Sequence, residues 1–291
     1  MTQANHAMGA VLAAACVLAL GGCSSDEPEE VVRTSGALAD GFEIEPGSGL
    51  VGTVFPSGDE GLHVFLRVDE DMERVFEGYA RQAGELGYPV TAPGWWPDGQ
   101  WCSDDPERWN SSVGEDTPFE VECSAYGSDI DESDGPPYRS MSLRGLAEPD
   151  GSGYLEISGG EFSGAPTAPR SPVEDGPVAP LTDAEVVAPD LAVNEDDPLL
   201  IVEGSELVFD PFPSTCATGG WEAMIRVTGD LLPVMRGYAE QIDAMRAFSR
   251  AEVVGDEDQP SVYSSAAGGG DLYAVGVAGD PSYILLGRCN D

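Results

Sequence analysis

The amino-acid sequence predicts an α+β protein built from two tandem copies of a ββαβββ unit, each an antiparallel sheet with one helix packed on a face. The first observation is an internal match. FLRVDEDMERVFEGYARQ, which starts at Phe65, matches MIRVTGDLLPVMRGYAEQ, which starts at Met224, at an offset of 159 residues. The second is that GSGLVGTVFPS matches GSELVFDPFPS and VECSAYG matches VYSSAAG, in the same order. Ordered self-similarity of this kind indicates a duplication.

Each copy begins with short β-rich runs and then changes to a helical period. LVGTVF and LHVFLRV, separated by a Pro-Ser-Gly turn, are typical of neighbouring strands. Helical spacing follows Asp71 and Asp230, which stand where helix N-caps belong. Gly78 and Gly237 fall inside the helices, where each glycine lowers helix stability by about 1 kcal/mol relative to Ala. We expect them to let each helix approach a sheet closely. The helical faces comprise Met72, Val75, Phe76, Tyr79, Ala83 and Leu86 in the first copy, and Leu231, Val234, Met235, Tyr238, Ile242 and Met245 in the second.

Three further strand-like runs complete each copy. They are FEVECSAY, RSMSLRGL and GYLEIS in the first copy, and SVYSSAA, DLYAVGV and SYILLG in the second. An antiparallel sheet with one helix across one face satisfies this order of elements.

Composition sets the boundaries of these units. The stretch between the copies is rich in Pro, Ala and acids, which predicts a semi-rigid linker rather than a core. The expected parts are a signal peptide (1–22), a lipidated N-terminus and acidic tether (23–41), a first unit (42–162) with a Trp-rich insertion (94–111), a linker (163–197) and a second unit (198–291).

The N-terminal segment carries a processing signal. An apolar run from Ala10 to Leu20 has signal-peptide length and ends in Leu20-Gly21-Gly22-Cys23. This segment resembles the lipobox of bacterial lipoproteins. The resemblance implies cleavage before Cys23, a diacylglycerol (palmitate-type) anchor on its sulfur, and a location on the extracytoplasmic side of the membrane. The alternative is a short buried helix with a chance cysteine. The lack of Lys or Arg before the apolar run departs from secretory signals and puts the assigned start in question.

The charge is strongly negative. The chain has 13 basic residues, all Arg, against 53 acids, a net charge of −40. Such a field repels phosphate backbones, so the sequence excludes nucleic acid as a partner. The composition favours an interpretation in which the charge keeps the protein soluble in a salt-containing medium outside the cell. The alternative is that the charge binds a cationic or protein ligand.

Once Cys16 leaves with the signal peptide and Cys23 carries the lipid, four cysteines remain, and they predict two disulfides, as expected for an exported protein. Cys102 lies in the insertion and Cys123 on the following strand, while the second copy has Ser264 in place of Cys123. A bond between Cys102 and Cys123 would hold the insertion down, leaving Cys216 to pair with Cys289. The absence of any Cys-x-x-Cys pair argues against zinc, and no cofactor is expected.

The insertion concentrates four of the five tryptophans. The indoles either pack the insertion itself or line a cleft for a sugar, a peptide or a cationic group. The ligand-binding candidates are Trp95, Trp96, Trp101 and Trp109.

Other chemical motifs give little. A calcium loop at Asp129, Asp131 and Asp134 is weighed against a solvated hairpin loop, which the spacing favours. His63 lies among apolar residues on the strand face of Phe65, opposite Val64 and Leu66, and a structural or surface role is expected rather than catalysis. Its counterpart in the second copy is Glu222, at the offset of 159 residues.

The sequence therefore predicts a lipid-anchored, non-enzymatic protein of unknown biochemical activity that binds a ligand or partner outside the membrane, with cell-wall material among the candidate ligands. The alternatives are a carboxylate-dependent extracytoplasmic hydrolase and a structural or assembly component of an envelope complex. The absence of nucleophile-elbow, zinc-protease and phosphate-loop motifs makes an enzyme the less favoured reading.

Overall fold

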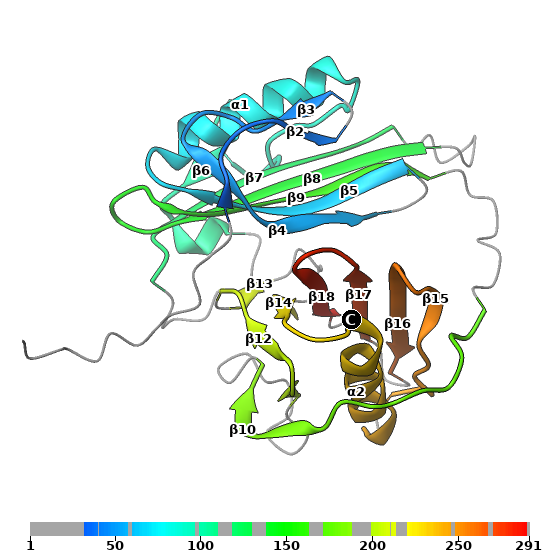
Figure 1. Cartoon of the computed structure of the whole chain (residues 1–291). Coiled ribbons are helices and arrows are strands. Elements are labelled where there is room, and N and C mark those ends of the chain that lie inside the picture. The colour runs from blue at the N-terminus through cyan, green and yellow to red at the C-terminus, as the bar shows by residue number, and fades with distance from the viewer. Residues whose placement is uncertain are drawn as a thin grey trace, which may run out of the picture.

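The structure of the protein is a computed structural model. It describes residues 32–39, 41–57, 60–96, 99–109, 118–129, 138–162, 171–187, 199–209, 211–213, 220–245, 248–266 and 270–289. Within these residues the fold is mostly antiparallel β-sheet with two α-helices, which is an α+β architecture (Figure 1).

Two seven-stranded sheets form the body of the molecule. The first sheet has the order β1-β4-β5-β9-β8-β7-β6, and the second has the order β12-β14-β18-β17-β16-β15, with β13 also paired to β14. The strands of the first sheet are β1 (Val32–Arg33), β4 (Ser48–Pro56), β5 (Glu60–Val68), β6 (Cys102–Ser103), β7 (Val121–Ser128), β8 (Tyr138–Ala147) and β9 (Gly153–Phe162). Those of the second are β12 (Ser205–Leu207), β13 (Phe212–Pro213), β14 (Gly220–Val227), β15 (Val254–Asp256), β16 (Gln259–Ser265), β17 (Asp271–Val277) and β18 (Ser282–Cys289).

Smaller elements surround the two sheets. One α-helix packs on each sheet, and two short hairpins and a 3-10 turn lie outside them. These elements are α1 (Met72–Glu85), α2 (Leu231–Ala244), the hairpin of β2 (Ala37–Ala39) and β3 (Phe42–Glu43), the pair of β10 (Leu181–Val186) and β11 (Leu200–Val202), and a turn at Pro106–Arg108.

The layers follow the order α1, first sheet, second sheet, α2 (Figure 1). Strand alternation produces this order, because successive side chains point to opposite faces of a sheet. On β5, Val64 and Leu66 pack in the core beneath α1, whereas Phe65 packs against the second sheet. This confirms the two faces predicted for that strand.

The inner faces of the two sheets meet in a separate apolar core. Gly52 in β4 adopts φ +65° at a register shift, and a Cβ placed there would lie 2.3 Å from Met224 Sδ and 3.1 Å from the Tyr283 ring. The second sheet can approach this closely because residue 52 has no side chain. The buried members of this inter-sheet core are Val51, Phe55, Phe65, Leu146, Phe209, Phe212, Met224, Tyr283 and Leu285.

Each helix is fixed to its half of the molecule by a matched pair of contacts. The Tyr79 hydroxyl lies 2.8 Å from Ser48 Oγ, and the Tyr238 hydroxyl lies 3.2 Å from Ser205 Oγ. The Gln82 side chain bonds both backbone groups of Glu43, at 2.8 and 3.0 Å. Gln241 bonds both backbone groups of Leu200, also at 2.8 and 3.0 Å.

The helix termini and the helical glycines differ in part from expectation. Asp71 caps α1 by accepting a hydrogen bond from the backbone N–H of Arg74, as predicted, whereas Asp230 occupies the N-cap of α2 without a side-chain capping bond. A Cβ at Gly78 would lie 2.6 Å from the Glu45 side chain, so this glycine admits a loop rather than a sheet. At Gly237 the nearest atoms belong to Val202 of β11, a small pair of strands outside the main sheet.

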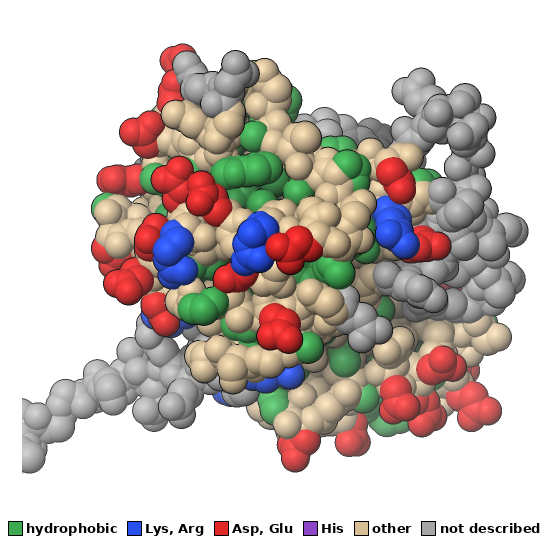
Figure 2. Space-filling model, turned by 90° about the horizontal axis from the view of Figure 1, so that it is seen from above, with side chains coloured by type: hydrophobic (Ala, Val, Ile, Leu, Met, Phe, Trp, Pro, Cys, Tyr) green, Lys and Arg blue, Asp and Glu red, His purple; other side chains and the backbone are tan. Residues whose placement is uncertain are grey.

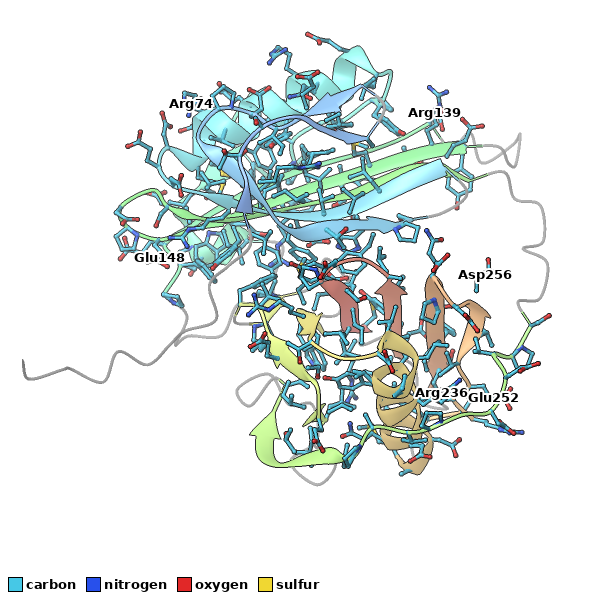
Figure 3. The ribbon with its side chains drawn as sticks, in the orientation of Figure 1. Arg74, Arg139, Glu148, Arg236, Glu252 and Asp256 are labelled. Atoms are coloured by element: carbon cyan, nitrogen blue, oxygen red, sulfur yellow. A yellow bond between two sulfur atoms is a disulfide. The ribbon has the colours of Figure 1, made fainter. Side chains whose placement is uncertain are left out.

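Two segments expected outside the units contain residues that pack onto them. Leu38 in the expected tether is buried, and β1 pairs with β4. In the expected linker, the Val173 backbone N–H donates to Val253, and Arg236 of α2 donates to the carbonyls of Glu174 and Pro177 (Figure 3). Scattered apolar residues in these polar stretches bury against the body, because burying apolar surface is favourable even in a short segment.

Acidic side chains are spread over the face above α1, with a few basic side chains among them (Figure 2). Neither α-helix of the described chain combines the length and the apolar character that a membrane crossing needs.

Candidate functional site

Among the described residues, buried charged side chains gather between the two sheets. His63 on β5 and Glu156 on β9 come from the first sheet, and Glu222 on β14 comes from the second. We call these three residues the His–carboxylate cluster. All three point into the space between the sheets, because their strand neighbours point toward α1 or α2.

The cluster is compact. His63 Nε2 lies 3.1 Å from Glu156 Oε1 and 3.5 Å from Glu222 Oε2. One ligand atom from each of the three side chains lies within 4.8 Å of the other two. His63 Nε2, Glu156 Oε2 and Glu222 Oε2 are nevertheless buried without a properly directed hydrogen bond. The nitrogen is thus near two carboxylates but is not directed at either as a donor.

Tyr273 on β17 fixes one side of Glu222. Its hydroxyl donates a hydrogen bond to Glu222 Oε1 across the intervening strand β18. Gly287 is the residue of β18 that pairs with both, and a Cβ there would lie 2.4 Å from the tyrosine hydroxyl. The absence of a side chain at this position lets the ring cross the strand and leaves Glu222 Oε2 facing His63.

Arg144 on β8 joins the cluster to its surroundings. Its Nε lies 3.2 Å from Oε1 of Glu122 on β7, and its Nη1 donates to the carbonyl of Pro213 in the second sheet. The guanidinium also lies 5.4 Å from the centre of the Phe212 ring. Arg144 therefore connects the two sheets by both a hydrogen bond and a ring contact.

The pKa values in the cluster are strongly perturbed. Burial opposes the charge of His63, but the nearby carboxylates of Glu222 and Glu156 outweigh burial and raise the pKa of His63 to about 10. Burial and the charge of Glu222 raise the pKa of Glu156. Burial also acts to raise the pKa of Glu222, but the charge of His63 and hydrogen bonds from its neighbours lower it overall. The pKa values of the two carboxyls are thus shifted in opposite directions.

Burial also shifts the pKa values of Arg144 and Tyr273, the residues next to the cluster. Desolvation lowers the pKa of Arg144, although Glu122 and Glu156 act against the change. The pKa of Tyr273 is raised well above its ordinary value by burial and then by the charge of Glu222, which keeps the phenol protonated as a donor.

Access to the cluster is restricted. The side chains of His63, Glu156 and Glu222 are 13%, 2% and 4% exposed. A sugar or peptide cannot reach both carboxylates in this arrangement, whereas a proton or a single ion fits within it. The chemistry open to the site is therefore the holding of a small cation or a shared proton.

The Trp-rich insertion does not gather its indoles into one cleft. Trp95 is 60% exposed and the adjacent Trp96 is 4% exposed. Trp101 packs beside Phe76 of α1, with ring centres 6.2 Å apart, and Trp109 donates its indole N–H to Ser103 at 3.0 Å. The insertion is thus mainly packed on the first sheet, with Trp95 as its exposed aromatic side chain.

The structure forms the predicted disulfide between Cys102 and Cys123, with sulfurs 2.00 Å apart. The bond joins β6 to β7, which also pair as strands. Cys289 is disulfide-bonded, but Cys216 lies outside the described residues, so their pairing stays a prediction. Cys23 also lies outside them.

The considered calcium loop is described only at its first residue. Asp129 accepts a hydrogen bond from the backbone N–H of Arg139 and so closes the β7–β8 hairpin. Asp131 and Asp134 lie outside the described residues.

Sequence reasoning missed Glu156, Glu222 and Arg144 as site residues. Two signals were present in the sequence. Glu222 is the repeat counterpart of His63, the residue that it meets between the sheets. Arg144 and Glu156 also interrupt strand runs that are otherwise apolar or small. Neither signal reveals which sheet faces pack together.

Comparisons with known proteins leave the chain without an assigned family. Neither the protein-family models nor the curated proteins include a match. Among solved structures, the crystal structure of an acyl-CoA thioesterase II, TesB2, from Mycobacterium marinum aligns over 82% of this chain and 95% of its own, at 10% identity and a TM-score of 0.15. A similarity of this size carries no argument about fold or function.

Proposed function

We propose that this protein is a non-enzymatic, lipid-anchored extracytoplasmic binding protein. The observation that carries the non-enzymatic part is the sealing of the His–carboxylate cluster between the sheets. Catalytic groups must reach the reacting atoms of a substrate.

The hydrolase alternative has one observation in its favour. Glu156 and Glu222 are neighbouring carboxyls whose pKa values are pushed in opposite directions, a feature of acid–base pairs in enzymes. Glycoside hydrolysis also needs room between two carboxyls for a sugar ring and a water. The burial of both side chains leaves no such room, and for this reason we favour binding over hydrolysis.

We also infer that the two halves arose by duplication of one ββαβββ unit. The matched helix contacts support this inference, because Tyr79 and Tyr238 are 159 positions apart and so are Gln82 and Gln241. Equivalent side chains make equivalent bonds in the two halves, which a chance sequence match would not produce.

Membrane anchoring is tested at Cys23. We expect the wild-type protein to sediment with membranes and to be released only by detergent, since two acyl chains give stable attachment. A Cys23→Ala variant should appear in the soluble fraction. Retention of that variant in membranes at the wild-type level would refute the lipoprotein assignment.

The binding surface is proposed at the insertion around Trp95, which the disulfide holds against the first sheet. An exposed indole in a segment that also carries Asp104 and Glu107 suits a sugar ring or a cationic group. The test is a tryptophan-fluorescence titration with soluble cell-wall glycan fragments and with a cationic peptide.

One of these probes should shift the emission, and Trp95→Ala should weaken its binding by about tenfold or more, within the range of aromatic binding residues. Tyr263→Ala removes an equally exposed aromatic residue from the second sheet and serves as the control. Equal binding by the two variants, or no response to either probe, would contradict the assignment.

A further inference from the structure

The geometry points to a divalent-cation site between the two sheets, formed by His63 Nε2, Glu156 and Glu222. The site is independent of the binding function proposed above, because it is buried whereas Trp95 lies at the surface. It was not expected from the sequence, in which the only histidine outside the leader lies far from any other metal-ligand motif.

The spacing of the three ligand atoms fits a single ion. Nitrogen and oxygen ligands bind Zn²⁺ at about 2.0–2.2 Å, and in a tetrahedral site this places neighbouring ligand atoms about 3.3–3.5 Å apart. His63 Nε2 lies 3.1 Å from Glu156 Oε1 and 3.5 Å from Glu222 Oε2. The distances between the side chains therefore need little adjustment to surround a cation.

Each of the three residues also has a buried polar atom without a directed hydrogen bond. These atoms are Nε2 of His63, Oε2 of Glu222 and Oε2 of Glu156, which is the oxygen other than the one 3.1 Å from His63. Both glutamates are more than nine-tenths buried, so bulk water has little access to their unpaired oxygens. Buried polar atoms are normally satisfied, and a cation between these three would satisfy them together.

Charge balance gives a third argument. In the ion-bound state, Glu122, Glu156 and Glu222 would supply three negative charges to this buried region, and Arg144 would supply one positive charge. The ion displaces the protons that His63 and Glu156 hold in its absence, and the remaining two negative charges are neutralised by one divalent cation. Buried charges need such compensation.

The donor set indicates the class of metal. Imidazole with two carboxylates suits Zn²⁺ or Mn²⁺, whereas Ca²⁺ prefers oxygen ligands alone. Tyr273 holds the other oxygen of Glu222 and would orient this ligand, as outer hydrogen bonds do in metal sites. Because the ligands come from β5, β9 and β14, a bound ion would join the two sheets directly.

The test uses the full chain, stripped with EDTA, dialysed, and titrated with ZnCl₂ in a calorimeter. We expect about one bound Zn²⁺ per chain. His63→Gln and Glu222→Gln should each weaken binding by more than tenfold, because mutating even a residue that only hydrogen-bonds to a metal ligand lowers metal affinity by about 10- to 100-fold. The matched control is Glu206→Gln, a carboxylate of the same sheet that pairs with Arg226. It should bind Zn²⁺ as the wild type does.

A second readout covers the case in which a cluster variant fails to fold. The chain has two histidines, so its imidazole ¹⁵N spectrum should hold only two side-chain systems. Zn²⁺ should shift the signals of His63 in the wild-type protein. Binding of less than about one tenth of an equivalent, or binding that leaves the His63 signals unchanged, would overturn the proposal.

Discussion

At the scale of single residues, Gly287 allows Tyr273 to reach Glu222 of the His–carboxylate cluster. Tyr273 reaches Glu222 only across the backbone of this glycine. The same logic applies to Arg144, whose guanidinium can reach Pro213 because the inner faces of the sheets are in contact. Single side chains thus carry the polar links through an otherwise apolar contact.

Gly287→Ala should destabilise the protein by about 1–3 kcal/mol, because the new methyl group displaces Tyr273 and leaves a buried Glu222 oxygen without its donor. Urea unfolding measures the free energy of unfolding. Gly229→Ala is the control, since a Cβ there meets nothing within 4 Å. Equal effects of the two alanines would argue against the tyrosine contact.

Tyr79 gives a prediction for alkaline pH. Burial raises its pKa to about 12 from an ordinary value of 10.0, so the folded state favours the protonated phenol. The associated stability is complete below pH 10 and is lost as the pH rises from 10 to 12, up to about 2–3 kcal/mol.

Unfolding of wild type and Tyr79→Phe between pH 9 and 11 tests this prediction, together with the phenolate absorbance of each protein. The stability of the wild type should fall more steeply above pH 10 than that of the variant. Parallel curves would show that the hydroxyl of Tyr79 ionises as it does in water.

At the scale of elements, β4 is shaped by its contact with the second sheet. Its register shifts between Val51 and Phe55, and Gly52 adopts a left-handed φ of +65° within the shift. The strand therefore bends where Met224 and Tyr283 press against it.

Gly52→Ala should cost about 1–3 kcal/mol, since it combines a left-handed backbone with a contact to Met224. Gly36→Ala is a matched control, because it has φ +102° but meets nothing within 4 Å. The difference between the two free energies of unfolding isolates the contact between the sheets. No difference would mean that the sheets do not press together at β4.

Local pattern predicted these elements well. The alternation of Val64, Phe65 and Leu66 gave both faces of β5, and Asp71 gave the start of α1. Pattern could not distinguish Trp95 from Trp96, adjacent indoles with opposite exposure, because the fate of each depends on the path of the loop. The sequence pattern could not predict the His–carboxylate cluster either, because His63 and Glu222 are brought together only by the packing of the two sheets.

At the scale of the whole molecule, acidic side chains are spread over the face above α1 (Figure 2), and a small charged cluster lies within the apolar core between the sheets. We expect the negative charge of the chain to disfavour anionic partners. Buried charges are costly unless they are paired, and we therefore propose that the cluster favours the arrangement of the sheets in which His63, Glu156 and Glu222 meet.

A double-mutant cycle of His63→Gln and Glu222→Gln, measured by urea unfolding in EDTA, tests this account most directly. Because the two side chains lie 3.5 Å apart from opposite sheets, we predict a coupling free energy of about 0.5–3 kcal/mol. The cycle of His63→Gln with Glu206→Gln should be additive within about 0.5 kcal/mol. Additivity in both cycles would contradict the pairing of the sheets through His63 and Glu222.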